Sequence, residues 1–367
     1  MTTYGITGAD GFLGWHLQCR LLTLPATEVR TADLDTFADP AALDAFLDGC
    51  DVVFHLAGVN RGEPEDVAAG NIHAARDLVA SKERTGARFL LAYSNSVKAG
   101  EDSAYGQSKQ QAADILAAAQ QQTGDPFVEF VLPHLFGEHG RPFYNSAVAT
   151  FAHQLATGGT PEIMVDSELE LVHAQEVSRA IVEAAVRGES VRLRPAGTRI
   201  MVSDALALLQ RLSAPYLASG LVPATESDFE LRMFNMFRSQ LFPAHCPIPL
   251  TVHSDPRGRF FETIRSTGQG QASISTTAPG VTRGEHFHFD KIERFVVVSG
   301  EAMIRIRRLL DDEVHEYRVS GDEPVAIDMP TLHPHNITNV GRGELVTQFW
   351  TNDLFDPENP DTIPAPV

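Results

Sequence analysis

The alternation of strand-like and helix-like segments changes once along the 367-residue chain, near residue 245. Before this point, short apolar runs typical of strands alternate with longer runs of helical periodicity, starting with a strand at residues 4–7 and a helix at 12–24. The same alternation continues through residues 29–32, 39–47, 52–56, 67–81 and 88–92. This order predicts an α/β domain with a parallel sheet covered by helices on both faces.

After residue 245 the segments are short, rich in β-forming residues and separated by Gly, Pro and Asp. The predicted strands cover residues 260–264, 272–276, 294–298, 303–307, 315–319, 325–328 and 344–349. Such spacing predicts an all-β antiparallel sandwich or barrel. Residues 242–249 include three prolines, Pro243, Pro247 and Pro249, and suggest a domain boundary. We therefore expect one domain over residues 1–245 and a second over 246–367.

Composition excludes several classes of partner. The chain has 29 Lys and Arg residues against 48 Asp and Glu residues, a formal charge of −19, which disfavours general binding to nucleic acid or to anionic membranes. Its three cysteines, Cys19, Cys50 and Cys246, are far apart in sequence, so we expect no disulfide framework and a reducing compartment. The first residues show no secretion signal, and we expect a cytoplasmic protein without a membrane span.

A glycine-rich turn follows the first predicted strand. Gly8, Gly11 and Gly14 are each three residues apart, which allows a tight turn and lets the backbone approach a pyrophosphate at the helix N-terminus. The predicted cofactor contacts in this turn are Gly8, Gly11, Phe12, Leu13 and Gly14. A ligand-free turn is the alternative interpretation of such a motif.

The residues after the second predicted strand bear on which dinucleotide binds. Asp33 lies nineteen residues beyond Gly14 and can accept hydrogen bonds from adenosine ribose hydroxyls, which favours NADH over NADPH. Asp35 is a second candidate for the same role, and Arg30 is the basic residue nearby.

A proton-transfer set is predicted further along the same half. Tyr105 and Lys109 are four residues apart and share one face of a helix. An ammonium near a phenol favours the phenolate, so the tyrosine can exchange a proton with a carbonyl oxygen as hydride is transferred. Ser96, at the end of a predicted strand, can hydrogen-bond the same oxygen, and Ser94 is the alternative.

The second half contains a pattern typical of a metal site. His286 and His288 point the same way on a strand, Glu293 follows five residues later, and His335 comes from a distant segment. Three imidazoles and a carboxylate suit zinc, iron, manganese, nickel or copper. In an extended chain His333 faces the same side as His335, and we interpret it as a further ligand, a partner of a ligand or a proton carrier.

The first half resembles the extended short-chain dehydrogenase/reductase family in its glycine-rich turn, the run His55-Leu56-Ala57-Gly58, Ser96 and Tyr105-x-x-x-Lys109. The resemblance implies a Rossmann-like fold in which Leu56, Ala57 and Gly58 line the cofactor. It also implies that Tyr105 is the acid/base, that Lys109 binds the nicotinamide ribose and that Ser96 polarises the carbonyl. Val131 and His134 depart from the family, since many relatives carry Arg and Asn there.

The second half resembles the cupin family along residues 280–300, although Leu332 replaces a glycine of the second cupin motif. This resemblance implies a jelly-roll barrel with metal bound by His286, His288, Glu293 and His335.

Over nearly its whole length the chain resembles the CapF-type bifunctional enzymes of bacterial surface polysaccharide synthesis. The runs that carry this resemblance are His55–Arg61, Tyr144–Phe151, Val297–Gly300 and Phe355–Thr362. It implies that the cupin epimerises a UDP-linked 4-keto-6-deoxy-N-acetylhexosamine at C3. The first domain then reduces the C4 ketone with NADPH, towards N-acetyl-L-fucosamine-type precursors. A homodimer with zinc in its cupin is also implied.

Several points remain open at the level of sequence. His333 and Tyr317 are both candidates for the epimerase base, because each carries a group able to transfer a proton. A metal with a structural role would leave a reductase of another nucleotide sugar with a catalytically silent cupin. A cofactor-binding protein without enzyme activity is a third interpretation, although loss of at least one site residue would then be expected.

Overall fold

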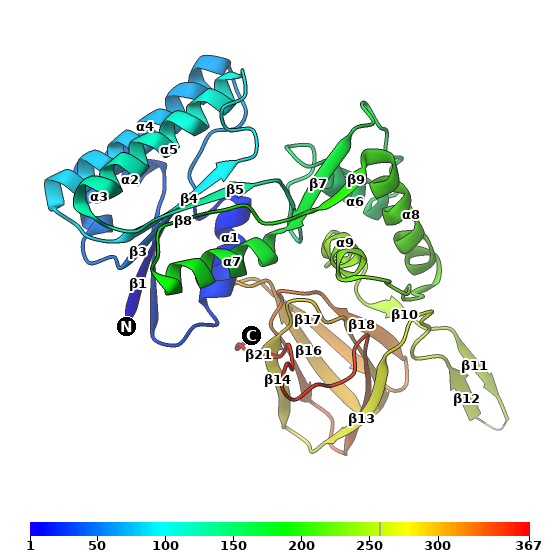
Figure 1. Cartoon of the computed structure of the whole chain (residues 1–367). Coiled ribbons are helices and arrows are strands. Elements are labelled where there is room, and N and C mark those ends of the chain that lie inside the picture. The colour runs from blue at the N-terminus through cyan, green and yellow to red at the C-terminus, as the bar shows by residue number, and fades with distance from the viewer. Residues whose placement is uncertain (257) are drawn as a thin grey trace. The chain divides into compact units, whose positions relative to one another are not determined.

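The computed structural model describes residues 1–256 and 258–367, which divide into two compact units (Figure 1). Unit 1 contains Met1–Leu135 and Leu169–Arg199, and unit 2 contains Phe136–Glu168 and Ile200–Val367. The chain therefore passes between the units more than once. The division at 245/246 remains a prediction about where two sequence modules join.

Unit 1 is built on a parallel sheet of six strands in the order β2-β1-β3-β4-β5-β8. Its strands are β1 (Thr2–Thr7), β2 (Thr27–Ala32), β3 (Val52–His55), β4 (Leu90–Ser96), β5 (Phe127–Leu132) and β8 (Val191–Leu193). Its helices are α1 (Phe12–Leu21), α2 (Leu34–Ala38), α3 (Pro40–Leu47), α4 (Pro64–Thr85), α5 (Ala104–Thr123) and α7 (Ala174–Arg187). The predicted Rossmann-like α/β class is confirmed.

Two hydrophobic cores form because successive strand residues point to opposite faces of the sheet. On one face, Ile6 and Phe54 pack with residues of α1 and α7, such as Leu17 and Ile181. On the other face, residues of β3 and β4 pack with α3, α4 and α5. Figure 1 shows α4 and α5 on one side of this sheet and α1 and α7 on the other. Several predicted site residues lie at or directly after the carboxyl ends of these strands, among them Ser96 at the end of β4.

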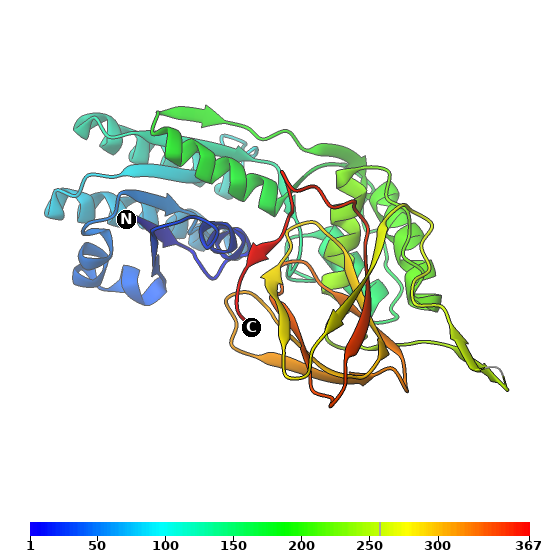
Figure 2. The ribbon, with the colours of Figure 1, turned by 90° about the horizontal axis from the view of Figure 1, so that it is seen from below.

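Unit 2 combines three helices with a β-barrel of two five-stranded sheets. The helices are α6 (Ala147–Ala156), α8 (Val202–Ser219) and α9 (Asp228–Ser239). One sheet has the order β10-β18-β15-β20-β13, and the other has β17-β16-β19-β14-β21. Strand pairs within both sheets are antiparallel, and apolar residues of both, including Phe295 and Ile337, form one core. The predicted all-β second architecture is confirmed (Figure 2).

The barrel strands have the following bounds: β10 (Ile248–Pro249), β13 (Gln271–Thr277), β14 (Thr282–Phe287), β15 (Glu293–Ser299), β16 (Glu301–Arg307), β17 (Val314–Ser320), β18 (Val325–Met329), β19 (His335–Asn339), β20 (Leu345–Thr351) and β21 (Ile363–Pro364). Strands β11 (Val252–Asp255) and β12 (Gly258–Phe261) pair as a separate hairpin. A three-stranded sheet contains β6 (His134–Phe136), β7 (Glu168–His173) and β9 (Thr198–Met201). The short strand β21 pairs with β14, so the C-terminal segment, red in Figure 1, lies beside the strand that carries the predicted metal ligand His286.

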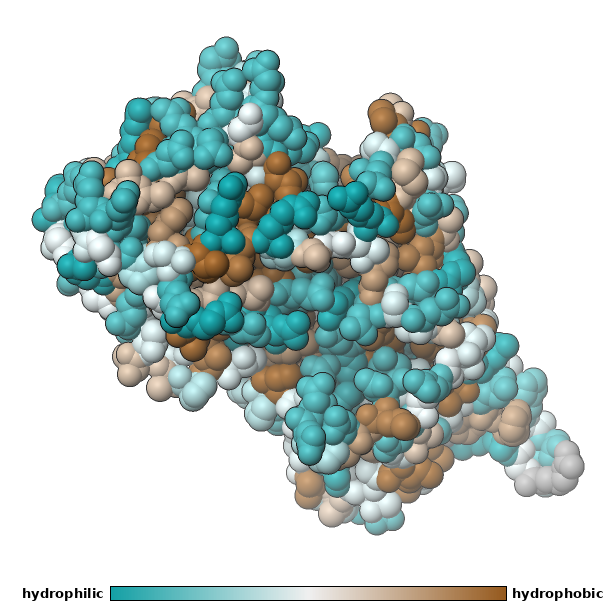
Figure 3. Space-filling model, viewed as in Figure 1, coloured by the Kyte–Doolittle hydropathy of each residue, from teal (hydrophilic) through white to brown (hydrophobic). Residues whose placement is uncertain are grey.

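Within residues 1–256 and 258–367, no helix combines the length and apolar character needed to cross a membrane. On the face seen in Figure 3, hydrophobic residues form patches that are separated by hydrophilic ones.

Candidate active sites

The glycine-rich turn between β1 and α1 is closed by contacts that exclude side chains. Gly8 has a φ of +72°, and a Cβ atom there would lie 2.7 Å from the Ala57 amide nitrogen. A Cβ on Gly14 would lie 2.2 Å from the Gly8 carbonyl oxygen. Gly11 is the N-cap of α1 and makes no side-chain cap. The first N–H groups of α1, including those of Phe12 and Leu13, therefore meet no capping side chain, as binding of a pyrophosphate requires.

The segment Leu56-Ala57-Gly58 connects the glycine-rich turn in space with Lys109. The Ala57 amide donates to Thr7 Oγ1 at 3.2 Å, which holds the segment Leu56-Ala57-Gly58 against the end of β1. A Cβ on Gly58 would lie 3.9 Å from Lys109 Nζ and 2.9 Å from Asn71 Oδ1. The structure thus brings the glycine-rich turn, the Leu56–Gly58 segment and Lys109 into one region of unit 1.

Ser96, Tyr105 and Lys109 lie together at the end of β4 and the start of α5. Helix α5 begins at Ala104 because Ser103 accepts a hydrogen bond from the Gly106 amide at 3.0 Å, and this places Tyr105 in the first turn with Lys109 one turn later. Burial raises the pKa of Tyr105, and a hydrogen bond with Ser96 acts in the opposite direction. The serine that contacts Tyr105 is therefore Ser96, whereas the Ser94 hydroxyl donates to the His55 carbonyl oxygen at 3.4 Å.

Lys109 has partners that sequence reasoning did not identify. Its Nζ donates to the Ser94 carbonyl oxygen at 2.5 Å and lies 4.2 Å from the centre of the Tyr93 ring. Burial lowers the pKa of Lys109 to about 7, and the Glu129 carboxylate opposes this shift. Ser94 thus contributes through its backbone, which no pattern of side chains in the sequence could reveal.

The buried ammonium predicts how the stability of the ligand-free protein depends on pH. Because the folded-state pKa of Lys109 lies below the unfolded value, the unfolded chain binds more protons from about pH 7 to about pH 10, and stability should rise with pH there. Melting temperatures of the wild type and Lys109→Met should therefore diverge in favour of the wild type as pH rises. Lys98→Met, at an exposed position, is the control. An equal difference at all pH values would contradict a depressed pKa.

Asp33 directly follows β2, as predicted, and caps the short helix α2. Its Oδ1 accepts hydrogen bonds from the Thr36 amide at 2.8 Å and the Thr36 hydroxyl at 2.7 Å, and these bonds lower the pKa of the exposed carboxyl. Arg30 Nε lies 2.8 Å from Glu28 Oε1, and Arg30 Nη1 donates to the Asp48 carbonyl oxygen at 2.5 Å. The position thus presents a carboxylate, while the nearby arginine is held by other partners.

The predicted metal ligands converge in unit 2. One ligand atom from each of His286, His288, Glu293 and His335 lies within 4.8 Å of the others. His286 and His288 come from β14 and the residue after it, Glu293 begins β15, and His335 begins β19. Glu293 Oε2 lies 3.8, 3.1 and 3.0 Å from Nε2 of His286, His288 and His335, respectively. Burial raises the pKa of Glu293, but hydrogen bonds from the three histidines hold it well below its usual value.

The donor chemistry of this cluster fits a divalent transition metal. Nδ1 of His288 faces the Asp361 carbonyl oxygen at 2.5 Å, and Nδ1 of His335 faces the His333 carbonyl oxygen at 3.0 Å. These contacts place a proton on Nδ1 of both rings, so Nε2, which faces Glu293, is the nitrogen that would coordinate a metal ion after losing its own proton. Three imidazole nitrogens and one carboxylate oxygen are ligands of the kind that zinc and its neighbours accept.

His333 does not join this cluster. Its ring lies 5.3 Å from the His139 ring and 5.0 Å from the Phe242 ring, and its Nδ1 contacts the Thr331 carbonyl oxygen at 2.8 Å. Burial lowers the pKa of His333 to about 4. Strand β19 begins only at His335, so His333 lies in the non-strand segment before it and the two-residue alternation does not apply. The role of His333 as a base stays a prediction.

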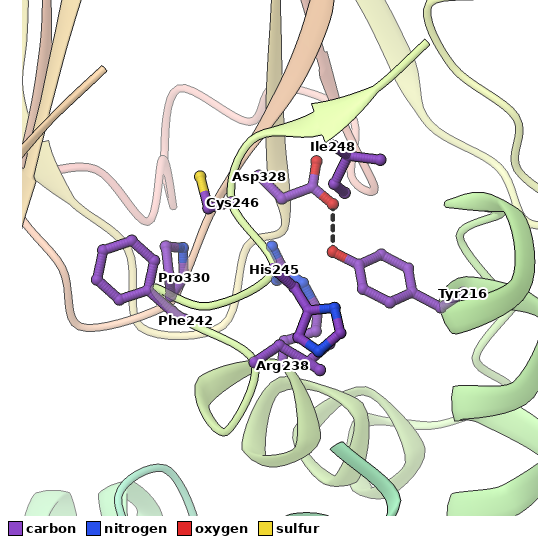
Figure 4. Close-up of a pocket in the computed structure, with 9 residues that line it drawn as sticks. Tyr216, Arg238, Phe242, His245, Cys246, Ile248, Asp328 and Pro330 are labelled. Carbon is purple, nitrogen blue, oxygen red and sulfur yellow. Dashed lines mark hydrogen bonds between the residues drawn. The ribbon is translucent and has the colours of Figure 1, made fainter. Parts of the chain in front are cut away.

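Tyr317 and Cys246 border the same barrel core and share a hydrogen bond. Burial raises the pKa of Tyr317, and burial also raises the pKa of the Cys246 thiol to about 12. Close by is a cavity of about 20 Å³, lined by residues that include Arg238, His245, Cys246 and Asp328 (Figure 4). This volume accommodates about one water molecule, so the cavity is too small for a sugar nucleotide.

A buried ionic network borders this cavity and adjoins the metal-ligand strand. Arg294, next to Glu293, donates to both carboxylate oxygens of Asp328 at 2.5 and 2.8 Å. The Tyr216 hydroxyl donates to Asp328 at 2.5 Å, as Figure 4 shows. Burial raises the pKa of Asp328, but the charge and hydrogen bonds of Arg294 outweigh it and lower the pKa. The network ties α8 to β15 and β18 beside Glu293.

Each half of the chain matches a known protein family. Residues 5–193 match the NAD dependent epimerase/dehydratase family, and residues 253–363 match the polysaccharide biosynthesis C-terminal domain. The chain is 33% identical over 375 residues to a UDP-2-acetamido-2,6-beta-L-arabino-hexul-4-ose reductase of Pseudomonas aeruginosa, covering 99% of this chain and 98% of that protein. The spore coat polysaccharide biosynthesis protein SpsL of Bacillus subtilis is 29% identical over 122 residues, covering 30% of this chain and 81% of that protein.

Among solved structures, the capsular polysaccharide assembling protein CapF of Staphylococcus aureus is 30% identical, with full coverage of both chains and a TM-score of 0.63. The fold, the glycine-rich turn and these matches define a class of nicotinamide-dependent enzyme joined to a barrel domain. The chain belongs to the NAD dependent epimerase/dehydratase family and has the two-domain form of the CapF-type capsule enzymes.

Proposed function

We propose that this chain is a bifunctional nucleotide-sugar enzyme of surface polysaccharide synthesis. Its substrate is a UDP-linked 4-keto-6-deoxy-N-acetylhexosamine, whose C3 centre is inverted at the barrel and whose C4 ketone is reduced in unit 1. The observation that carries the proposal is that one chain holds both the Ser96–Tyr105–Lys109 set and the cluster of three histidines with Glu293. The ketone at C4 is supported by the Pseudomonas aeruginosa relative, a UDP-2-acetamido-2,6-beta-L-arabino-hexul-4-ose reductase.

In the reduction, the nicotinamide cofactor supplies the hydride. Ser96 hydrogen-bonds the ketone oxygen together with Tyr105, and the Tyr105 hydroxyl gives that oxygen its proton. Lys109 favours the resulting phenolate through its charge and binds the nicotinamide ribose. These roles match the observed hydrogen bond between Ser96 and Tyr105 and the position of Lys109 beside Gly58.

In the epimerisation, a divalent metal, which we propose to be zinc, would polarise the ketone as a Lewis acid. His286, His288, Glu293 and His335 would hold it. The chain must also supply a group that removes the C3 proton and returns one to the opposite face, and His333 and Tyr317 remain the candidates. Neither ring lies in the ligand cluster among the described residues, which keeps a silent cupin as the alternative.

Solvent exchange separates these two alternatives. The full-length, zinc-loaded protein is incubated with the UDP-4-keto sugar in D₂O without nicotinamide, and deuterium at C3 is followed by NMR. The bifunctional proposal predicts incorporation that depends on the metal. A metal-loaded protein that reduces the ketone but leaves the C3 hydrogen unexchanged would favour the silent cupin.

The exposed carboxylate of Asp33 predicts a preference for NADH, contrary to the NADPH that the CapF-type resemblance implies. A 2′-phosphate would face this negative charge, and we expect kcat/KM to be about tenfold higher with NADH. Asp33→Asn keeps an oxygen to accept the Thr36 amide and should narrow the preference for NADH. Asp35→Asn tests the second candidate and should leave the preference unchanged if Asp33 is the residue that faces the ribose. A strong preference of the wild type for NADPH would overturn this interpretation of Asp33.

A homodimer, implied by the CapF-type resemblance, completes the proposal. Sedimentation velocity at several protein concentrations measures this property directly.

A further inference from the structure

One carboxylate accepts hydrogen bonds from three amides of the turn that connects the predicted metal ligands His288 and Glu293. Residues 289–292 connect His288 to Glu293, and three consecutive amides of this turn point to Asp361. Asp361 Oδ1 accepts from the Phe289 amide at 2.9 Å, and Oδ2 accepts from the Asp290 and Lys291 amides at 3.0 and 2.9 Å. Hydrogen bonds from N–H groups to an ionised carboxylate are stronger than neutral ones, so this contact fixes the path of the turn.

The backbone of Asp361 acts on the ligand itself. Its carbonyl oxygen lies 2.5 Å from His288 Nδ1, while His288 Nε2 lies 3.1 Å from Glu293 Oε2. Asp361 therefore sets the proton position and orientation of one ligand ring while its side chain holds the turn that leads to the next ligand. Asp361 has a φ of +39°, a left-handed conformation that costs energy in a residue other than glycine and is often kept at functional positions.

Neighbouring contacts keep Asp361 in place. The Lys291 ammonium donates to the Pro360 carbonyl oxygen, and Asn352 Oδ1 accepts from the Ile292 amide at 2.7 Å. Beyond Asp361, β21 pairs with β14 so that Pro364 lies opposite His286. The C-terminal segment is thus attached to the ligand strand on one side of Asp361 and to the ligand turn on the other.

Helix α9 holds the same turn through a different group. Asn235 Nδ2 donates to the Asp290 carbonyl oxygen at 2.8 Å. Helix α9 also holds the turn through Arg232, whose Nε donates to Asp290 Oδ1 at 3.2 Å. Asp361 and Asn352 therefore accept from the amides of the turn, while α9 contacts its carbonyl and carboxylate oxygens. Asp361 also contacts a ligand ring directly, because its carbonyl oxygen faces His288 Nδ1.

We propose that Asp361 is a positioning residue of the metal centre, which brings His288 and Glu293 to one point through the 289–291 amides and His288 Nδ1. This inference rests on the metal centre of the proposed function. Asparagine in its place would keep one acceptor oxygen and direct an NH₂ group at the other N–H donors, so the charge and one of the two acceptor positions would be lost.

The test measures metal binding rather than turnover. Zinc affinity of the full-length protein is determined by competition with a chromophoric chelator for the wild type, Asp361→Asn and Asp356→Asn. The matched control, Asp356, lies in the same segment and accepts only a local bond from the Glu358 amide at 2.9 Å among the contacts the structure describes. Asp361→Asn should bind zinc about 10–100-fold more weakly, and Asp356→Asn should match the wild type.

Spectra of the cobalt-substituted protein give a second readout. The visible bands of Asp361→Asn should shift because the ligand geometry changes, and Asp361→Glu, which keeps the carboxylate, should restore part of both the spectrum and the affinity. NADH binding should be unchanged in every variant and reports on folding of unit 1. If Asp361→Asn destabilises unit 2, the zinc affinity and cobalt spectrum of Asp361→Glu are compared with those of Asp356→Asn instead.

The outcomes distinguish two failures. If the wild-type protein binds neither zinc nor cobalt, the proposed metal centre is wrong. If both Asp361 variants bind metal with the wild-type affinity and spectrum, the metal centre stands but Asp361 does not position its ligands.

Discussion

Replacing Tyr105 with phenylalanine should reduce the rate of ketone reduction by about 10²–10⁴-fold, because the Tyr105 hydroxyl, which is hydrogen-bonded to Ser96, is the group proposed to supply the proton. The change removes one oxygen and leaves the ring, so packing at the start of α5 should persist. Steady-state oxidation of NADH in the presence of the UDP-4-keto sugar measures the effect. Exchange of the C3 hydrogen with solvent should continue, since the barrel residues are untouched.

Tyr4→Phe is the matched control for this loss. Tyr4 is a buried tyrosine of the same unit that packs in the hydrophobic core against Phe54. Its phenylalanine variant should reduce the ketone at the wild-type rate. Near-normal turnover by Tyr105→Phe would instead remove Tyr105 from the reaction.

Replacing His288 with alanine should impair metal binding and C3 exchange but spare ketone reduction. One of three imidazoles is lost, and Glu293 loses a partner at 3.1 Å, so we expect metal content to fall below one equivalent and C3 exchange to slow by more than about 100-fold. Reduction of a substrate that already has the inverted C3 centre should continue, because Ser96, Tyr105 and Lys109 are unchanged. Elemental analysis and NMR exchange measure the two effects.

His253→Ala is the control for the histidine change. His253 is exposed in the β11–β12 hairpin, and its described ring contact is with Phe260. It should retain metal and exchange. Simultaneous loss of exchange, reduction and cooperative unfolding in His288→Ala would show that the metal supports the whole fold rather than one reaction.

Local patterns in the sequence were sufficient for features that depend on short spacing. The four-residue interval between Tyr105 and Lys109 and the Ser103 cap place both side chains on α5. The alternation of His286 and His288 predicts convergence, and the structure brings both together with Glu293 and His335. The roles of these residues in catalysis and metal binding remain predictions that the variants above test.

Features that depend on distant pairing were not predictable in this way. The Ser94 carbonyl meets Lys109 because β4 and α5 pack together, and Asp361 meets the 289–291 amides across seventy residues of chain. His333 shows the limit of a periodic argument, because the argument assumes a continuous strand, whereas β19 begins only at His335. The packing of α8 against the barrel likewise rests on Tyr216 and Asp328, which are 112 residues apart.

The most direct test follows hydrogen from two sources, deuterium from the solvent and protium from the cofactor, into one product. The wild-type protein, loaded with zinc, is given the UDP-4-keto-6-deoxy-N-acetylhexosamine in D₂O with unlabelled NADH, and the purified product is examined by NMR and mass spectrometry. Passage of one sugar through both sites predicts deuterium at C3 from solvent and protium at C4 from the cofactor, with the C3 configuration inverted. A reduced product that keeps its original C3 hydrogen and configuration would contradict the two-step reaction.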